Sequence, residues 1–145
     1  MNHRDSFTDN FDHSTLVFVT DQFRCERLIA AGYALAEATR TTLVVMSVAP
    51  TGATANAAAI EHLYQVTRDH DAVMNVVYAD DDVAGIMSRA ILQNKACHVV
   101  TGLPKDDSSV IVKLWRIHSA VNFYTVSLDG QLNAIPYESR CPAQE

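Results

Sequence analysis

The sequence predicts an α/β protein: a three-layer α/β/α sandwich around an open sheet of five parallel strands. Five short apolar runs, rich in β-branched and aromatic residues, start near residues 15, 42, 73, 97 and 121. Runs that are apolar throughout indicate strands covered on both faces, as parallel strands are. The spacings of 27, 31, 24 and 24 residues between these starts each leave room for one crossover helix. Right-handed crossovers then distribute the helices over both faces of the sheet.

Each predicted element follows from a local pattern. Strands are expected over 14–20, 42–48, 72–79, 97–101 and 121–127, and stripes at helical spacing lie between them over 28–39, 60–67, 83–91 and 110–117. We expect Asp80–Asp82 to cap the third helix and Ser108 and Ser109 to cap the fourth, because such side chains accept hydrogen bonds from free helical amides. The pattern predicts one domain over 14–130, with a flexible N-terminal tail over 1–13 and a C-terminal tail over 131–145.

Composition excludes several functions. The 145 residues carry 11 Lys and Arg against 17 Asp and Glu, a formal net charge of −6, and contain no basic run. A protein that binds the nucleic-acid backbone is therefore not expected. The three cysteines form no C-x-x-C pair, which argues against structural zinc and a dithiol redox site. No apolar stretch approaches the roughly 20 residues of a membrane span, and the polar N-terminus does not resemble a signal peptide. We expect a cytoplasmic protein that binds neither nucleic acid nor membrane.

The carboxyl ends of the predicted strands form the functional edge of the sheet. In an open parallel sheet, ligands bind beyond these ends, where the strand order reverses. No G-x-x-x-x-G-K-[ST] loop, G-x-G-x-x-G turn, G-x-S-x-G elbow or H-E-x-x-H pair occurs in the chain. We therefore expect no catalytic residue, no metal, and a binding protein rather than an enzyme. The residues expected at the edge are Thr20 and Asp21, Val48 and Ala49, Asp80–Asp82, and Thr101 and Gly102.

The acidic residues at this edge allow one enzymatic alternative. Asp21 and Asp80 could hold magnesium as in response-regulator receivers, with Asp80 as the phosphate acceptor and Thr101 as the hydroxyl after the fourth strand. A receiver also needs a lysine after the fifth strand, where this chain has Leu128, Asp129 and Gly130. The sequence therefore favours the simpler interpretation of the acidic cluster as a helix cap.

Three segments of the chain resemble universal stress proteins. They are LVFVTDQFRCERLIAAGYALAE with the following TTLVVMSVAP, the segment from IEHLYQVTRDHDAV to KACHVVTG, and SSVIVKLWRIHSAVNFYTV, which together span about residues 14–128. The resemblance implies a Rossmann-like fold related to adenine-nucleotide alpha-hydrolases, usually in a dimer. Many members bind ATP through G-x2-G-x9-G-[ST] after the fourth strand and an Asp that ends the first. Such glycines let backbone amides approach phosphates at a helix N-terminus.

The ATP motif of the family matches this chain only in part. The stretch between Gly102 and Ser108 has five residues where the motif has twelve, and it contains Asp106 and Asp107. The resemblance implies these positions: Thr20 where the family has its Asp, with Asp21 beside it; Val48 and Ala49 at the adenine; Gly102 as the first glycine; Lys105 as the second; Ser108 and Ser109 as the final pair.

A short, acidic loop with few glycines predicts weak or absent ATP binding. Each lost N–H donor to a charged oxygen costs about 1.5–3 kcal/mol, and Lys105 offsets part of this loss as a point charge. A smaller or less charged anion remains a candidate ligand, with Ser109 and Gly102 as its expected contacts. The sequence thus favours a small regulatory binding protein of the universal stress type, and the alternative is an ATP-binding member with slow turnover.

The fifth predicted strand lies at an edge of the sheet. It carries no Lys, Pro or other feature that protects exposed edges, and the family commonly pairs this strand across a two-fold axis. We therefore expect a homodimer in which Phe123, Tyr124, Thr125 and Val126 take part. The alternative is that the C-terminal segment 132–137 folds back over this edge.

Overall fold

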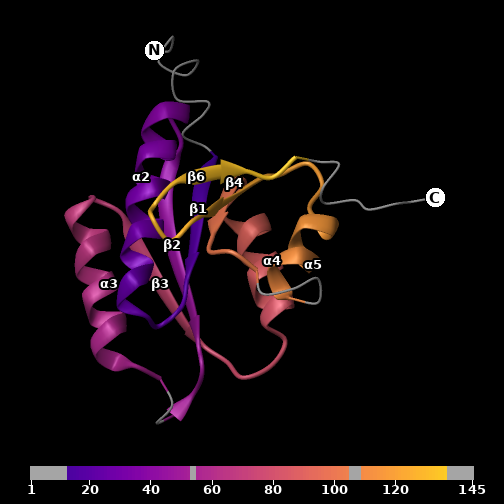
Figure 1. Ribbon diagram of the computed structural model, residues 1–145. Helices are drawn as coiled ribbons and strands as arrows, with labels where there is room; N and C mark the ends of the chain where they lie inside the picture. The colour runs from indigo at the N-terminus through magenta and orange to yellow at the C-terminus, as the bar shows by residue number, and fades with distance from the viewer. Residues whose placement is uncertain (1–12, 53–54, 105–108, 137–145) are drawn as a thin grey trace, which may run out of the picture.

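The computed structural model describes residues 13–52, 55–104 and 109–136 as a three-layer α/β/α sandwich. Figure 1 shows the sheet between two helical layers, with α2 and α3 on one side and α4 and α5 on the other. The strands lie in the order β3-β2-β1-β4-β5-β6. The elements are β1 (Ser14–Val19), the short 3-10 helix η2 (Phe23–Cys25), α2 (Glu26–Thr39), β2 (Thr42–Ala49), α3 (Ala57–Asp69), β3 (Val73–Tyr78), α4 (Val83–Gln93), β4 (Ala96–Thr101), α5 (Val110–Ile117), β5 (Asn122–Val126) and β6 (Leu132–Ala134).

The five predicted strands are confirmed as parallel neighbours. β1 pairs with β2 on one side and with β4 on the other, so the strand order reverses between β1 and β4. Every residue of β1 is buried, as its apolar sequence predicts for a central strand covered on both faces. Alternate residues supply two cores: Val17 and Val45 pack towards α2 and α3, while Leu16 and Phe18 pack towards α4 and α5.

The predicted count of five strands is wrong, because the sheet formed by the described residues has six. The chain turns at Gly130, whose φ is +89°, and β6 then pairs antiparallel with β5. The turn is fixed locally, since the Ser127 hydroxyl donates to Asp129 and accepts from the Gln131 amide at 3.1 Å. The segment predicted as a C-terminal tail thus begins with a strand. Three residues are too few to show a strand periodicity in sequence.

β6 covers the edge of β5 that was predicted to be exposed. Tyr124 and Val126 lie opposite Ala134 and Leu132, and the amide of Ile135 donates to the Phe123 carbonyl at 2.8 Å. The alternative expectation, that the C-terminal segment covers this edge, is therefore the one the structure shows. A second chain can pair with β5 only if β6 moves. Homodimerisation itself stays a prediction.

The predicted helix caps have two different outcomes. Ser109 is the N-cap of α5, where its Oγ accepts from the Val112 amide at 3.4 Å; Ser108 lies outside the described residues. Asp82 occupies the N-cap position of α4 in a left-handed conformation without the expected capping hydrogen bond. Asp80 instead accepts from the backbone amide of Thr51 at 3.0 Å and from its hydroxyl. No helix within the described ranges is long and apolar enough to span a bilayer.

Candidate functional site

A cavity of about 490 Å³ opens at the carboxyl ends of β1 and β4. These are the two strands between which the strand order reverses, and ligands of open α/β sheets bind at such a point. Its volume falls in the range of about 300–1,000 Å³ that is typical of small-molecule sites. The cavity is bounded by the ends of the two strands, the beginnings of α2, α4 and α5, and the segment that follows β5.

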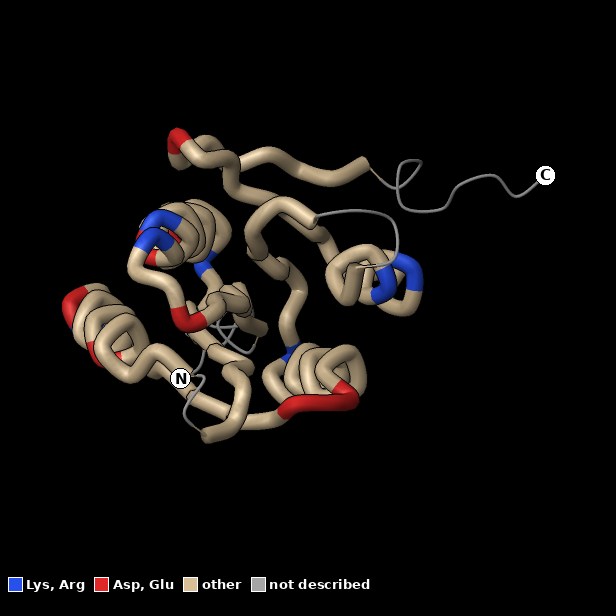
Figure 2. The backbone as a smooth tube through the Cα atoms, turned by 60° about the horizontal axis from the view of Figure 1, so that its bottom comes forward, with Lys and Arg blue, Asp and Glu red and all other residues tan. Residues whose placement is uncertain are grey.

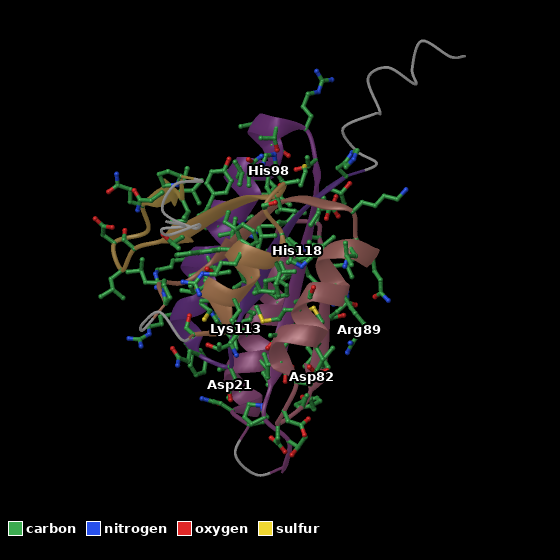
Figure 3. The ribbon with its side chains drawn as sticks, turned by 90° about the vertical axis from the view of Figure 1, so that its right-hand side faces the viewer. Asp21, Asp82, Arg89, His98, Lys113 and His118 are labelled. Atoms are coloured by element: carbon green, nitrogen blue, oxygen red, sulfur yellow. The ribbon has the colours of Figure 1, made fainter. Side chains whose placement is uncertain are left out.

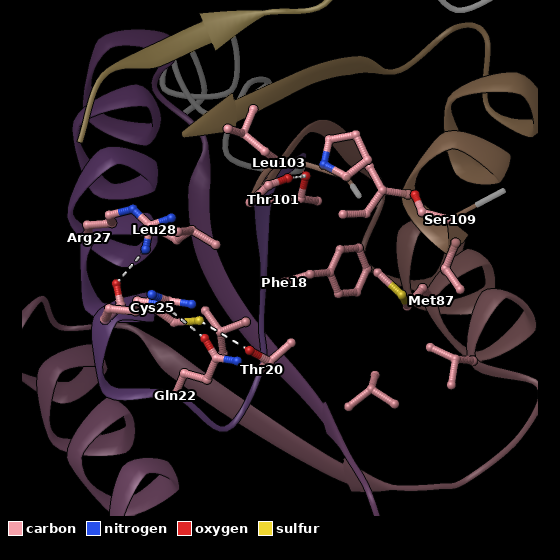
Figure 4. Close-up of a pocket in the computed structure, with 18 of the residues that line it drawn as sticks. Phe18, Thr20, Gln22, Cys25, Arg27, Leu28, Met87, Thr101, Leu103 and Ser109 are labelled. Atoms are coloured by element: carbon pink, nitrogen blue, oxygen red, sulfur yellow. Dashed lines mark hydrogen bonds between the residues drawn. The ribbon is translucent and has the colours of Figure 1, made fainter. Parts of the chain in front are cut away.

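Most of the cavity wall is apolar. Phe18 from β1, Leu28 from α2 and Met87 from α4 are all buried side chains that face it. Figure 4 shows Leu28 on the α2 side and Met87 on the opposite side, with Phe18 between them. Leu128, which is exposed, extends this apolar lining from beyond β5. The wall is therefore suited to an apolar body more than to a highly charged chain.

The hydroxyl groups at the cavity already have partners. Thr101 donates from Oγ1 to the Gly102 carbonyl at 2.8 Å, and Thr20 Oγ1 lies 3.4 Å from Cys25 Sγ. Ser109 uses its Oγ to cap α5. In this cap Ser109 accepts through its oxygen, so its hydroxyl proton can still be donated to an anion, whereas the Thr101 proton is already donated to a carbonyl.

Two arginines from the start of the α2 layer supply the positive charge at the cavity. Arg27 donates from Nε to the Ser127 carbonyl at 2.9 Å and from Nη1 to the Arg24 carbonyl at 2.8 Å. Arg24 donates from Nε to the Gln22 side chain at 3.2 Å. Figure 4 shows Arg27 and Gln22 on the α2 side of the cavity. No Asp or Glu lines the cavity in the described part of the chain.

Five of the predicted site residues line this cavity: Thr20, Val48, Thr101, Gly102 and Ser109. The position of Gly102 has room for a side chain, because a Cβ there would meet nothing within 4 Å among the atoms described. The predicted residues Lys105 and Ser108 lie outside the described residues, so their place relative to the cavity stays a prediction.

Two predicted site residues point elsewhere. Ala49 is buried in the core beneath α2 and α3, on the face of β2 opposite to Val48, because side chains alternate along a strand. Asp21 accepts from the Asn56 amide at 2.8 Å through Oδ2, which directs its carboxylate to the start of α3. Neither residue lines the cavity.

Two acidic residues at this edge, Asp21 and Asp80, accept hydrogen bonds from different residues. Asp21 bonds Asn56 and Asp80 bonds Thr51, whose two hydrogen bonds lower the pKa of Asp80. Among the described residues, no three His, Cys, Asp or Glu side chains gather in a way that could hold a metal ion. Figure 2 shows the acidic and basic positions in small separate groups, without a continuous basic surface over the described chain.

The histidines with displaced pKa values lie away from the cavity. Burial lowers the pKa of His98 on β4 and of His118 after α5. His118 Nε2 lies 2.6 Å from the Ser88 hydroxyl, yet neither residue lines the cavity. Figure 3 shows His98 at the end of the molecule opposite to Asp21 and Asp82. These contacts therefore connect helices and strands within the fold and supply no group to the candidate site.

The sequence reasoning did not predict Arg24, Arg27 and Gln22, which follow β1 along the chain and line the cavity. The residues predicted at this edge were those at the strand ends, such as Thr20. Their position in the first turns after β1 could have identified them, because the helix that follows the first strand begins beside the point where the strand order reverses.

Comparisons with known proteins support the fold. No protein-family model matches the chain, and no curated protein matches it. A solved structure, described as a protein from the universal stress protein family from Burkholderia pseudomallei, matches with a TM-score of 0.54 and 21% sequence identity. The match covers 78% of this chain and 94% of that one. The predicted resemblance is thus confirmed at the level of fold: the chain has the α/β architecture of a universal stress protein.

Proposed function

We propose that this protein is a non-enzymatic, small-molecule-binding regulatory protein of the universal stress type, which works in the cytoplasm as a homodimer and binds ATP weakly or not at all. The observation that carries the proposal is the largely apolar cavity at the reversal point between β1 and β4. Its position is where this class of sheet binds ligands, and most of its wall among the described residues is apolar, which favours a ligand with less charge than a triphosphate.

The polar groups of the cavity support weak rather than tight ATP binding. A triphosphate site is built from many N–H donors and a helix N-terminus free to receive charge. Here the Thr101 hydroxyl donates to the Gly102 carbonyl, so its proton is not available to a phosphate. The sequence from 103 to 107 is five residues long and includes two aspartates, where the ATP-binding motif has twelve residues. Carboxylates repel phosphate and add no donors.

An ATP-binding protein with slow turnover is the second candidate. It is favoured by the fact that Gly102 and Ser109, two residues that match the family motif, both line the cavity. The placement of Ser109 at the start of α5 directs the positive end of that helix to the same region.

Isothermal titration with ATP and magnesium distinguishes the two functions. The first predicts no measurable heat of binding, or a dissociation constant far above the micromolar range. A low-micromolar constant or tighter contradicts it and supports the second. Light scattering coupled to size-exclusion chromatography tests the dimer separately, because a homodimer has twice the 15.9 kDa mass of one chain. A mass of one chain at all concentrations contradicts that part of the proposal.

A further inference from the structure

The charge at the cavity is opposite to the charge of the chain as a whole. The chain has 17 acidic residues against 11 basic ones, yet among the described residues the charged side chains that line the cavity are Arg24 and Arg27. Neither arginine forms an ion pair with a described residue. An acidic chain that places two arginines and no described carboxylate around an apolar cavity has the charge complement of an anion.

Both arginines have N–H donors that form no hydrogen bond with described residues and that can bind a ligand. A guanidinium has five N–H donors and no acceptor. Arg27 uses its Nε and one Nη1 donor, and Arg24 uses only its Nε, in the hydrogen bonds formed with described residues. The contact from Arg27 to the Arg24 carbonyl holds the two residues together. A planar carboxylate matches the fork that such guanidinium groups present.

The remainder of the wall argues for a ligand with one charge rather than several. Phe18, Leu28 and Met87 are apolar and buried, and burying further charge against them is costly without paired groups. The anionic end of a ligand therefore fits the α2 side of the cavity, where Figure 4 shows Arg27, and its apolar body fits the region of Phe18 and Met87.

We infer that the cavity binds a small carboxylic acid with an apolar body, whose carboxylate contacts Arg24 and Arg27. This inference rests on the proposed binding function and names the chemical class of its ligand. It differs from a nucleotide in carrying a single negative charge and in having no need for the loop after Gly102. The same charge arrangement disfavours a cationic ligand, which would face two arginines without a described carboxylate to pair with.

Three probes with one ten-carbon chain and different head groups test the inference: decanoate, decanol and decyltrimethylammonium. The two ionic probes are titrated below their critical micelle concentrations and decanol below its solubility limit. Binding is followed by methyl NMR, with Met87 and Leu28 as reporters in the cavity and Leu63 as a reporter in the core beneath α3. Decanoate is expected to bind about tenfold more tightly than decanol, a difference of about 1.4 kcal/mol, and the cation is expected to bind most weakly.

Two single substitutions test the role of the arginines. Arg24→Gln removes one charge at the cavity and is expected to weaken decanoate by about fivefold, the upper range for an exposed ion pair, with decanol unchanged. Arg89→Gln removes the same charge from α4, where the residue lies 3.8 Å from Asp82 and does not line the cavity. It is expected to leave both affinities as in the wild type.

The outcomes separate this inference from the proposed function. Equal affinities for decanoate and decanol, or an Arg24→Gln variant that binds decanoate like the Arg89→Gln variant, overturn the carboxylate inference and leave a small-molecule site in place. Shifts at Leu63 as large as those at Met87 show binding outside the cavity and also overturn it. If no probe moves the cavity methyls while ATP with magnesium does so at low-micromolar concentration, the proposed function fails as well.

Discussion

Close packing between α2 and β1 gives a sharp prediction for Gly32→Ala. A Cβ at position 32 would lie closer than 3.0 Å to a side-chain methyl of Val17, which is fully buried in the central strand. Val17 is β-branched and has little rotamer freedom, so α2 must move away from the sheet. Overpacking of this kind costs about 1–3 kcal/mol, and alanine returns about 0.8–1.0 kcal/mol of helix propensity. Because Val17 cannot move aside, the upper end of the overpacking cost applies. After the gain in helix propensity is subtracted, we expect the free energy of unfolding to fall by about 2 kcal/mol.

Gly85→Ala is a matched control for this prediction. Its Cβ would also lie closer than 3.0 Å to another group, but that group is the exposed carboxylate of Asp82, which can rotate into solvent. The helix propensity of alanine then dominates, and stability rises by up to about 1 kcal/mol. Urea unfolding followed by circular dichroism measures both variants. A Gly32→Ala protein as stable as the wild type would refute the close packing of α2 on β1.

Three other predictions follow from particular contacts. The buried hydroxyl of Ser47 has no hydrogen-bond partner among the described atoms, so Ser47→Ala is expected to raise the free energy of unfolding by about 1 kcal/mol in urea titrations; a loss of stability contradicts this. Burial lowers the pKa of His98 and His118 in the folded state, so the unfolded state binds more protons and stability falls as the pH drops below about 6.5. Replacing both histidines with glutamine should flatten the fall between pH 7 and 5, and an unchanged pH profile argues against it. Deleting the chain from residue 131 onward exposes the edge of β5, and we expect concentration-dependent association by light scattering; a truncated chain as monodisperse as the full one would show that β6 does not protect this edge.

Most of the fold could be predicted because apolar runs and helical stripes report burial directly. The strands beginning near residues 15, 42, 73, 97 and 121 appear as β1 to β5 within one residue of those starts. The segment 132–137 was given as an alternative cover for the edge of β5, but it was not predicted as a strand, since β6 has three residues and leaves no periodic pattern. Its turn at Asp129 and Gly130 was visible in the sequence, but a turn alone does not say which strand the chain pairs with next.

The candidate site could be predicted only as an edge of the sheet. Thr20, Val48 and Gly102, which were chosen because they lie at strand ends, line the cavity. The alternation of side chains along β2 would have separated Val48 from Ala49, although the sequence reasoning treated them together. The direction of Asp21 depends on the amide of Asn56, 35 residues later, and such a contact follows from the packed structure alone.

We propose that the cavity at the ends of β1 and β4 does not hold a phosphate chain. The most direct test is to purify the protein without added nucleotide, denature it, and quantify adenine nucleotides released into the supernatant by chromatography. We expect far less than one nucleotide per chain. Release of one ATP or ADP per chain would contradict it and assign the cavity to nucleotide binding.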